Sequence, residues 1–454
     1  RECPLTQTAA QEAILKMPRV REKVGALQEL RFETRRSGGD DASNGTEANR
    51  LRVVSGTAEL FGMELFAGHE FRLMPGRSYG IFTWHGCEVD LDDSFCAGIY
   101  VSEETPMAEV ANIHQNLENI RQEAANENAN EQEKGPRVAV VGPPGSGKTS
   151  LCQILAGYAA RCGQKPAFVS LDLAKNDIMV PGTVAATVLQ GTRDLYGEQG
   201  ELMLTARQPL AYFVGNEKVS ANSTLFKDQV DALAAALDAR LEANPSEQHA
   251  GVIVDTFSWT SGSITAQKCL VHALQKLGVS IVLVMGHDRL LSEMRKSLPD
   301  LRVVKVTRSG GVVESDQTST KRHANERMRC YFYGPLSHLS PVRKTLTLGE
   351  DVTIILLKQN VIADSSIMPI GADEDLDANQ VPQMTTVDKT LEHCVLAFVH
   401  ADSPEEALNA PVAGFVHVLE VDIAHNTISA DFACPVDLPS TFLLHGSIKW
   451  FEQD

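Results

Sequence analysis

Eight consecutive residues, 142–149, match the pattern G-x-x-x-x-G-K-[ST], which is typical of a loop that binds phosphate groups. Glycines let successive backbone N–H groups turn towards phosphate oxygens, and a helix that begins at the end of the loop adds its positive end. We expect Lys148 to reach the β- and γ-phosphates of ATP and Thr149 to hold Mg²⁺. The expected nucleotide-binding residues are Gly142, Pro143, Pro144, Gly145, Ser146, Gly147, Lys148, Thr149 and Ser150.

The sequence on either side of this loop favours a nucleotide site over a chance match in a glycine-rich turn. Residues 138–141 form a short apolar run rich in β-branched side chains, which predicts a strand, and residues 150–162 predict a helix. Strand, loop and helix therefore follow one another in the order that the motif requires.

Two carboxylates that follow apolar runs are candidates for the chemistry at this loop. Asp255 ends the run GVIVD, where phosphate-loop proteins place an acid that holds Mg²⁺. Asp172 ends the expected strand PAFVSLDL, and its carboxylate could accept a proton from an attacking hydroxyl group, as phosphoryl transfer requires. Because Asp also caps turns, that role is an equal alternative for Asp172.

A basic run, residues 321–329, lies on an expected helix of this otherwise acidic chain. Arg327 and Arg329 could close over the phosphates and stabilise transition-state charge, although a solvated helix face explains such a run equally well. Trp259 follows the Asp255 strand and is a candidate platform for stacking an RNA base, or else a core residue. The lone His287 and His323 show no metal-ligand spacing, so we assign them no metal.

Alternating strands and helices must position these residues. From residue 135 to 335, short apolar runs alternate with helical patterns, which predicts a P-loop NTPase-type α/β domain with a parallel sheet covered on both faces. Ligands then bind beyond the carboxyl ends of the strands.

The flanking regions read differently. Residues 1–103 predict an N-terminal β-sandwich, with a helical-looking start and a polar loop at 37–49, because short alternating segments end at recurrent glycines. An apolar stripe at helical spacing predicts a linker helix within 104–134 that packs across the next domain. Residues 336–454 return to strand patterns and predict a small β-rich C-terminal domain with polar loops near 371–380 and 402–409.

Composition excludes several classes of protein. The chain has 454 residues and a formal net charge of −18, so its surface as a whole does not attract nucleic acid, and any RNA contact must be local. Nine dispersed cysteines without a C-x-x-C pair predict reduced thiols in the cytosol or nucleus and argue against a structural zinc site. We expect neither a membrane span nor a secretory signal, because no apolar run is long enough and the first residues lack an apolar segment. The chain lacks an initiator Met, and we therefore expect it to be truncated or a gene-model fragment.

Motifs along nearly the whole chain resemble those of one family. They are ELRFE (29–33), SGTAELFGMEL (55–65), FTWHGC (82–87), GPRVAVVGPPGSGKTS (135–150), VPGT (180–183), SGGVVE (309–314), RCYFYG (329–334) and AGFVHVLEVD (413–422). These motifs make the chain resemble the polynucleotide-kinase-related (Clp) family, which belongs to the pre-mRNA 3′-end cleavage and polyadenylation machinery. The fungal member of this family belongs to cleavage factor IA.

This resemblance implies three domains, a nuclear location and bound ATP with Mg²⁺. It also implies that Glu29 and Arg77 of the N-terminal domain contact the adenine end of the nucleotide. The implied partner is another cleavage factor subunit, a scaffold that also binds the RNA polymerase II tail, and RNA could be met through that complex or through the basic helix.

Active relatives phosphorylate the 5′-hydroxyl of RNA with residues that match Lys148, Asp172, Arg327 and Arg329. They carry Asp-x-Gly-Gln where this chain continues from Asp172 to Lys175, and an Arg where it has Ala324. The leading hypothesis is therefore an ATP-binding structural subunit with little or no turnover. The alternatives are an RNA 5′-hydroxyl kinase and, more weakly, the related kinase of ribosomal RNA processing.

Overall fold

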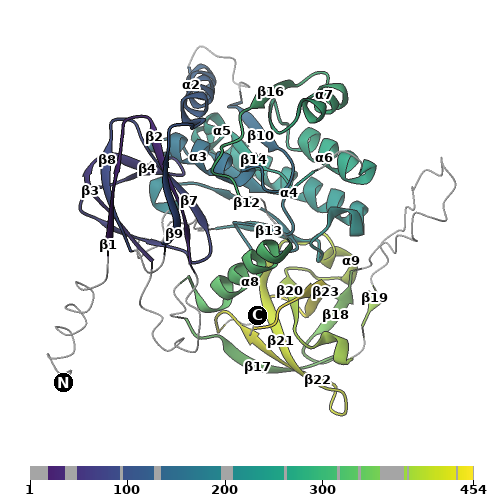
Figure 1. Ribbon diagram of the computed structural model, residues 1–454. Helices are drawn as coiled ribbons and strands as arrows, with labels where there is room; N and C mark the ends of the chain where they lie inside the picture. The colour runs from purple at the N-terminus through teal and green to yellow at the C-terminus, as the bar shows by residue number, and fades with distance from the viewer. Residues whose placement is uncertain are drawn as a thin grey trace, which may run out of the picture.

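The computed structural model describes residues 19–35, 49–92, 96–126, 134–195, 208–259, 263–313, 317–335, 339–357, 383–385, 388–435 and 438–452. Figure 1 shows an N-terminal β-domain packed beside a central α/β domain, with a C-terminal β-rich domain against another side of the central one. The expected helical start of the chain and the polar loops at 37–49 and 371–380 lie almost wholly outside the described residues.

The N-terminal domain is the expected β-sandwich, with a four-stranded sheet in the order β1-β8-β3-β6 and a five-stranded sheet in the order β5-β4-β7-β2-β9. Alternating apolar side chains from both sheets meet in one core that includes Leu30, Leu51 and Val89. The strands are β1 (Arg19–Val24), β2 (Gln28–Thr34), β3 (Asn49–Gly56), β4 (Ala58–Leu60), β5 (Met63–Leu65), β6 (Glu70–Leu73), β7 (Ser78–Thr83), β8 (Cys87–Asp92) and β9 (Cys96–Ser102).

A seven-stranded sheet in the order β13-β12-β11-β14-β10-β15-β16 forms the centre of the molecule. Five adjacent strands are parallel as expected, but β12 pairs antiparallel with both β11 and β13 near one edge, so the sheet is mixed rather than parallel. The difference arises because a loop without a crossover helix joins β11 to β12, so the chain turns back on itself and the two strands pair antiparallel. The strands are β10 (Arg137–Val141), β11 (Ala167–Ser170), β12 (Thr183–Val188), β13 (Leu210–Phe213), β14 (Val252–Asp255), β15 (Ile281–Met285) and β16 (Arg302–Val306).

Helices cover both faces of this sheet and complete two cores, one on each side. The stripe of α2 packs into the core that also holds the apolar side of α3, and α2 contacts α3 and α5, as expected of a helix lying across this domain. The helices are α2 (Met107–Ala124), α3 (Lys148–Arg161), α4 (Ser223–Ala243), α5 (Pro245–Ala250), α6 (Ile264–Lys276), α7 (Asp288–Ser297) and α8 (Gln317–Tyr333), with 3-10 turns η2 (Thr192–Leu195) and η3 (Val219–Asn222).

The C-terminal domain is built on a seven-stranded sheet in the order β17-β22-β21-β20-β23-β18-β19. The end of α8 joins it to the central domain, because Phe332 stacks on Trp450 with ring centroids 5.4 Å apart. Its elements are β17 (Val342–Thr347), β18 (Thr353–Leu356), β19 (Gln383–Met384), η4 (Lys389–Leu391), β20 (Cys394–Val399), α9 (Pro404–Ala407), β21 (Val412–Asp422), β22 (Thr427–Phe432) and β23 (Phe442–Lys449). Within the described part of the chain, no helix is long and apolar enough to cross a membrane.

Candidate functional site

The phosphate-loop motif folds into a tight turn between β10 and α3. Gly145 and Gly147 have positive φ angles of 61° and 91°, which other residues rarely adopt. A Cβ atom at Gly142 would lie 2.6 Å from the carbonyl oxygen of Met285 and from Ser146 Oγ, so the loop also needs glycine there. Ser146 Oγ is buried without a hydrogen-bond partner in the described residues, and thus remains available to a ligand in the loop.

Lys148 and Thr149 begin α3, and their side chains contact different groups. Lys148 Nζ donates to Pro143 O at 3.2 Å and to Ser258 Oγ at 3.0 Å, so its buried ammonium group is held beside the loop. Thr149 Oγ1 donates to Asp255 Oδ2 at 2.6 Å. The motif therefore brings the lysine expected to bind phosphate and the pair expected to bind metal together, as the order of strands around β10 requires.

The surroundings of Asp255 fit a divalent cation. Burial raises the pKa of Asp255 to about 7, against the lowering effects of the Lys148 charge and the Thr149 hydrogen bond. Asp255 Oδ1 is buried and has no hydrogen-bond partner in the residues that the structure describes. Hydroxyl and carboxylate oxygens are donors that Mg²⁺ accepts, and a cation here would favour the ionised carboxylate.

A cavity of 390 Å³ lies between the N-terminal and central domains, directly above the phosphate loop. We call it the interdomain cavity. Its walls come from the β-sandwich, from the loop and α3, from the segment after β11, and from α8. Among the residues that line it are Glu29, Arg31, Glu59, Arg77, Ser146, Lys148, Thr149, Asp172, Lys175, Asp177, Ser258, His323 and Arg327.

The β-sandwich side of the cavity is organised by Arg31. Its Nη2 donates to Glu29 Oε2 at 2.8 Å and to Glu104 O at 2.6 Å, and lies 3.4 Å from Ser309 Oγ of the central domain. Gly311 makes room for this side chain, since a Cβ atom there would lie 2.7 Å from Arg31 Nε. Arg31 therefore fixes the Glu29 carboxylate and ties the β-sandwich to the loop after β16.

A second connection between these domains is centred on Glu59, which is buried in β4. Its Oε1 accepts a hydrogen bond from Tyr158 Oη, and its Oε2 accepts one from Arg161 Nη1 at 2.9 Å. Both partners lie on α3, the helix that the phosphate loop begins. The carboxylate is thus paired across the interface, and the position of α3 depends on the β-sandwich.

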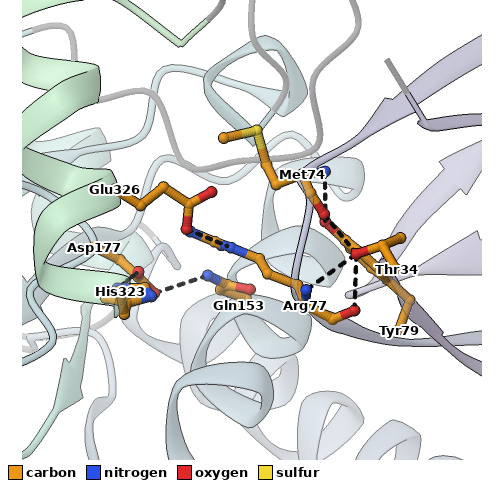
Figure 2. Close-up of polar contacts among 8 residues, drawn as sticks. All are labelled: Thr34, Met74, Arg77, Tyr79, Gln153, Asp177, His323 and Glu326. Atoms are coloured by element: carbon orange, nitrogen blue, oxygen red, sulfur yellow. Dashed lines mark hydrogen bonds and ion pairs between the residues drawn. The ribbon is translucent and has the colours of Figure 1, made fainter. Parts of the chain in front are cut away.

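A third connection joins both domains to α8 and is drawn in Figure 2. Arg77 Nη2 lies 3.1 Å from Glu326 Oε2, while Thr34 Oγ1 accepts from the backbone N–H of Arg77 at 3.0 Å. On the same helix, His323 Nε2 lies 3.1 Å from Asp177 Oδ1, and Asp177 Oδ2 accepts from Gln153 Nε2 of α3 at 3.2 Å. Both contacts hold α8 at the rim of the interdomain cavity.

Charged side chains around Asp177 stabilise this position of α8. Burial acts to raise the pKa of Asp177, but the neighbouring His323, with the charges of Arg77 and Arg327, holds it well below its usual range. Burial lowers the pKa of Arg327, whose Nε is buried without a hydrogen-bond partner in the described residues. A buried guanidinium group beside a phosphate loop is well placed to contact an anion.

Some of the other expected site residues line the interdomain cavity and others lie behind it. Asp172 lines the interdomain cavity, but it follows β11 by two residues instead of ending the strand, and its Oδ1 accepts from Ala174 N and Lys175 N at 3.0 Å each. The carboxylate therefore caps a turn and also lines the cavity, and its role as a proton acceptor stays a prediction. Gly145 to Ser150 line the cavity, whereas Gly142, Pro143 and Pro144 shape the loop behind it.

Two expectations need correction. Trp259 is only 2% exposed and belongs to the central core, so the stacking platform is wrong and the core alternative holds. Arg329 is exposed and lies outside the residues that line the cavity, because the helix turns it away from Arg327.

Sequence reasoning missed the cavity roles of Arg31, Glu59, Asp177, Lys175 and Ser258, and it set His323 aside. A signal existed for Arg31 and Glu59, which are charged residues within otherwise buried strands. For Asp177 and His323 the sequence gives no such signal, because these residues come together only in the fold.

Fold and site together define a P-loop nucleotide-binding protein whose central domain is completed by a β-sandwich. Three family models match successive parts of the chain: the N-terminal β-sandwich domain of polyadenylation factor (residues 23–124), the mRNA cleavage and polyadenylation factor CLP1 P-loop (142–334) and the pre-mRNA cleavage complex II protein Clp1 (339–452). The chain belongs to the Clp1 family of mRNA cleavage and polyadenylation factors, which confirms the resemblance seen in its motifs.

Relatives along the whole length support this membership. The chain is 34% identical to the CLP1 homolog of Arabidopsis thaliana, over 89% of this chain and 90% of that protein. It is 33% identical to the human polyribonucleotide 5′-hydroxyl-kinase Clp1, over 96% of this chain and 98% of that protein. A solved complex of wild-type Clp1p with Pcf11p has the same fold, with a TM-score of 0.78 and 24% identity over 96% of this chain and 99% of that one. A second solved structure, of the interface between the same two proteins and of ATP loss in a glycine-to-arginine mutant, matches at a TM-score of 0.78 and 23% identity over the same shares.

Proposed function

We propose that the chain is an ATP-binding structural subunit of the nuclear pre-mRNA 3′-end cleavage and polyadenylation complex, required for cleavage and polyadenylation and with little or no turnover. The observation that carries this proposal is the interdomain cavity, whose walls come from both the β-sandwich and the P-loop domain. A nucleotide with its phosphates at Lys148 and its adenine end near Glu29 and Arg77 would join the two domains. Thr149 and Asp255 would hold Mg²⁺, which would neutralise phosphate charge when bound.

The energy of such binding is sufficient for a structural role. A ligand that binds only the folded protein contributes RT ln(1 + [L]/Kd), which is about 4 kcal/mol at a thousandfold excess over Kd. That contribution needs no hydrolysis or transfer of phosphate.

Two features of the site favour low turnover. Asp172 Oδ1 already accepts two backbone hydrogen bonds, which hold this oxygen in the turn and leave it less available to a substrate hydroxyl group. Ala324, which stands where active relatives have an Arg, is buried on α8 and brings no charge to the phosphates.

The partner in this proposal is another cleavage factor subunit, a scaffold that also binds the RNA polymerase II tail. Its support is the similarity of this fold to Clp1p, which was solved in complex with Pcf11p. RNA would be met through that complex or through α8, where Arg327 lines the cavity.

An RNA 5′-hydroxyl kinase is the second candidate function. The observation in its favour is that Lys148, Asp172 and Arg327 line one cavity, in addition to the names of the mammalian relatives. In this function Asp172 would accept the hydroxyl proton, and Lys148 and Arg327 would stabilise charge on the transferred phosphoryl group.

The two functions are separated by incubating the purified chain with a 5′-hydroxyl RNA oligonucleotide and γ-labelled ATP, beside Lys148→Ala and Asp172→Asn. We expect no label on the RNA while the wild-type chain retains ATP and gains thermal stability from it. Label transfer that both variants abolish would replace the structural proposal by the kinase. If ATP changes neither the melting temperature nor partner binding, and Lys148→Ala behaves like wild type, the structural role is wrong.

A further inference from the structure

Outside the interdomain cavity, three side chains of metal-ligating type meet where α2 crosses the end of α3. His114 and Glu118 are one helical turn apart on α2, and Cys162 caps the C-terminus of α3. Their potential ligand atoms all lie within 4.8 Å of one another. None of the three lines the interdomain cavity, so the cluster is separate from the nucleotide site.

The distance between two of these atoms matches a tetrahedral zinc site. Cys162 Sγ lies 3.6 Å from His114 Nε2. With Zn–S near 2.3 Å, Zn–N near 2.05 Å and a tetrahedral angle, the expected S···N separation is about 3.6 Å. Nε2 is the ring nitrogen near Cys162 and is therefore the expected ligand atom, whereas His114 Nδ1 is buried without a hydrogen-bond partner in the described residues.

Surrounding residues hold these side chains in place. Glu118 Oε1 accepts from Gln164 Nε2 at 2.7 Å, and Glu118 Oε2 accepts from Arg121 Nη1 at 3.2 Å. The His114 ring packs on Tyr158 with centroids 5.3 Å apart. Hydrogen bonds to a ligating carboxylate are a kind of support that metal sites in proteins have.

We propose that His114, Glu118 and Cys162 bind one Zn²⁺ ion, with water as the fourth ligand on the exposed side of Cys162. Thiolate, imidazole and carboxylate form a donor set that suits zinc, whereas the oxygen-rich Thr149 and Asp255 pair suits Mg²⁺. On binding, the Cys162 thiol releases its proton to solvent, and no oxidation or reduction takes place. The ion fastens the helix that follows the β-sandwich to the helix that follows the phosphate loop.

The spacing of the cysteines along the chain could not reveal this site. Its ligands come from two helices, separated by the phosphate loop and its strand, and only one of them is a cysteine. A hydrogen bond between thiol and imidazole is the alternative explanation of the Cys162–His114 contact, and it predicts no metal uptake.

The test is a titration of the tag-free full chain with Co²⁺ in excess Mg²⁺, so that the nucleotide site is occupied by the harder ion. We expect one Co²⁺ per chain, a thiolate-to-cobalt absorption band in the near ultraviolet, and displacement by Zn²⁺. Cys162→Ser should abolish the band, whereas Cys434→Ser, which changes another exposed cysteine, should leave it unchanged. Gln164→Ala, which removes a hydrogen bond to Glu118, should weaken binding about 10-fold to 100-fold.

Folding of the variants is checked by their melting temperatures without metal, and Cys162 is exposed, so its substitution leaves the core intact. His114→Gln gives a second test, because it removes the imidazole and should also eliminate stoichiometric uptake. Absence of the thiolate band in the wild-type chain, or its persistence in Cys162→Ser, overturns the proposal.

Discussion

Asp255 allows a direct test of the electrostatics at the phosphate loop. Burial raises its pKa from an ordinary 3.8 to about 7, so between these values the folded state keeps a proton that the unfolded state has lost. The stability contributed by this group therefore falls as pH rises from about 4 to 7, and stays low above that. At 1.36 kcal/mol per pKa unit, the full penalty is about 4 kcal/mol.

Asp255→Asn removes the charge, while its amide oxygen can still accept the hydrogen bond from Thr149 Oγ1. Without nucleotide or metal, we expect the variant to be more stable than wild type at pH 8, by up to the full penalty. For a domain of this size, about 4 kcal/mol corresponds to a rise in Tm of about 10 °C. The difference should disappear as pH falls to about 4, where Asp255 is neutral in both folded and unfolded states.

The assay is a set of thermal melts from pH 4 to pH 8 for both proteins, repeated with ATP and Mg²⁺. With Mg²⁺ present the order should reverse, because the variant loses the carboxylate that the cation needs. A Tm difference that stays constant across this pH range would refute the raised pKa, and an equal Mg²⁺ effect in both proteins would refute the metal role.

Three further perturbations test the connections between domains. Gly311→Ala places a Cβ atom 2.7 Å from Arg31 Nε, so Arg31 must shift and displace the Glu29 carboxylate that it holds. We expect ATP binding, measured by calorimetry, to weaken about tenfold. Gly310→Ala places its Cβ atom 3.2 Å from Arg31 Nη1 and should have a smaller effect. Glu59→Gln should lower the free energy of unfolding, measured in urea, by about 1–3 kcal/mol, because Arg161 loses a charged partner. Glu64 lies 3.7 Å from the same guanidinium group and its side chain is 46% exposed, so Glu64→Gln should lower that free energy by less than about 1 kcal/mol. A double-mutant cycle of Arg77→Ala and Glu326→Ala should give a coupling free energy of unfolding of about 0.5–1 kcal/mol, which falls with added salt. A coupling of zero would mean that the pair does not hold α8.

The elements that the sequence predicts well are those whose signal is local. The phosphate loop, α3 and the apolar strand β14 each carry their pattern within about 15 residues, and each lies where that pattern requires. The antiparallel strand β12 was missed because its neighbour in the sheet is set by a loop return and not by a helix. Trp259 was ambiguous because an aromatic residue after a strand has the same local pattern in a core as at a binding surface.

The contacts that complete the candidate site are non-local, and this is why sequence reasoning did not reach them. Arg77 and Glu326 are 249 residues apart in the chain, and Glu59 and Tyr158 are 99 apart. A carboxylate within an apolar strand indicates that a partner exists, since burying an unpaired charge is costly, but it does not say which residue that partner is. Only the packing of α3 and α8 against the β-sandwich determines the pairs.

The placement of α8 bears on turnover. This helix carries Arg327 to the interdomain cavity, and it also carries Glu326 and His323, which pair with the β-sandwich and with Asp177. A movement of α8 that opened the cavity would break both pairs at once, whereas a bound nucleotide would add contacts to the same closed arrangement. Under the proposed function, the contacts that keep Arg327 in place would also slow the release of nucleotide, as expected for an ATP that stays bound and stabilises the subunit.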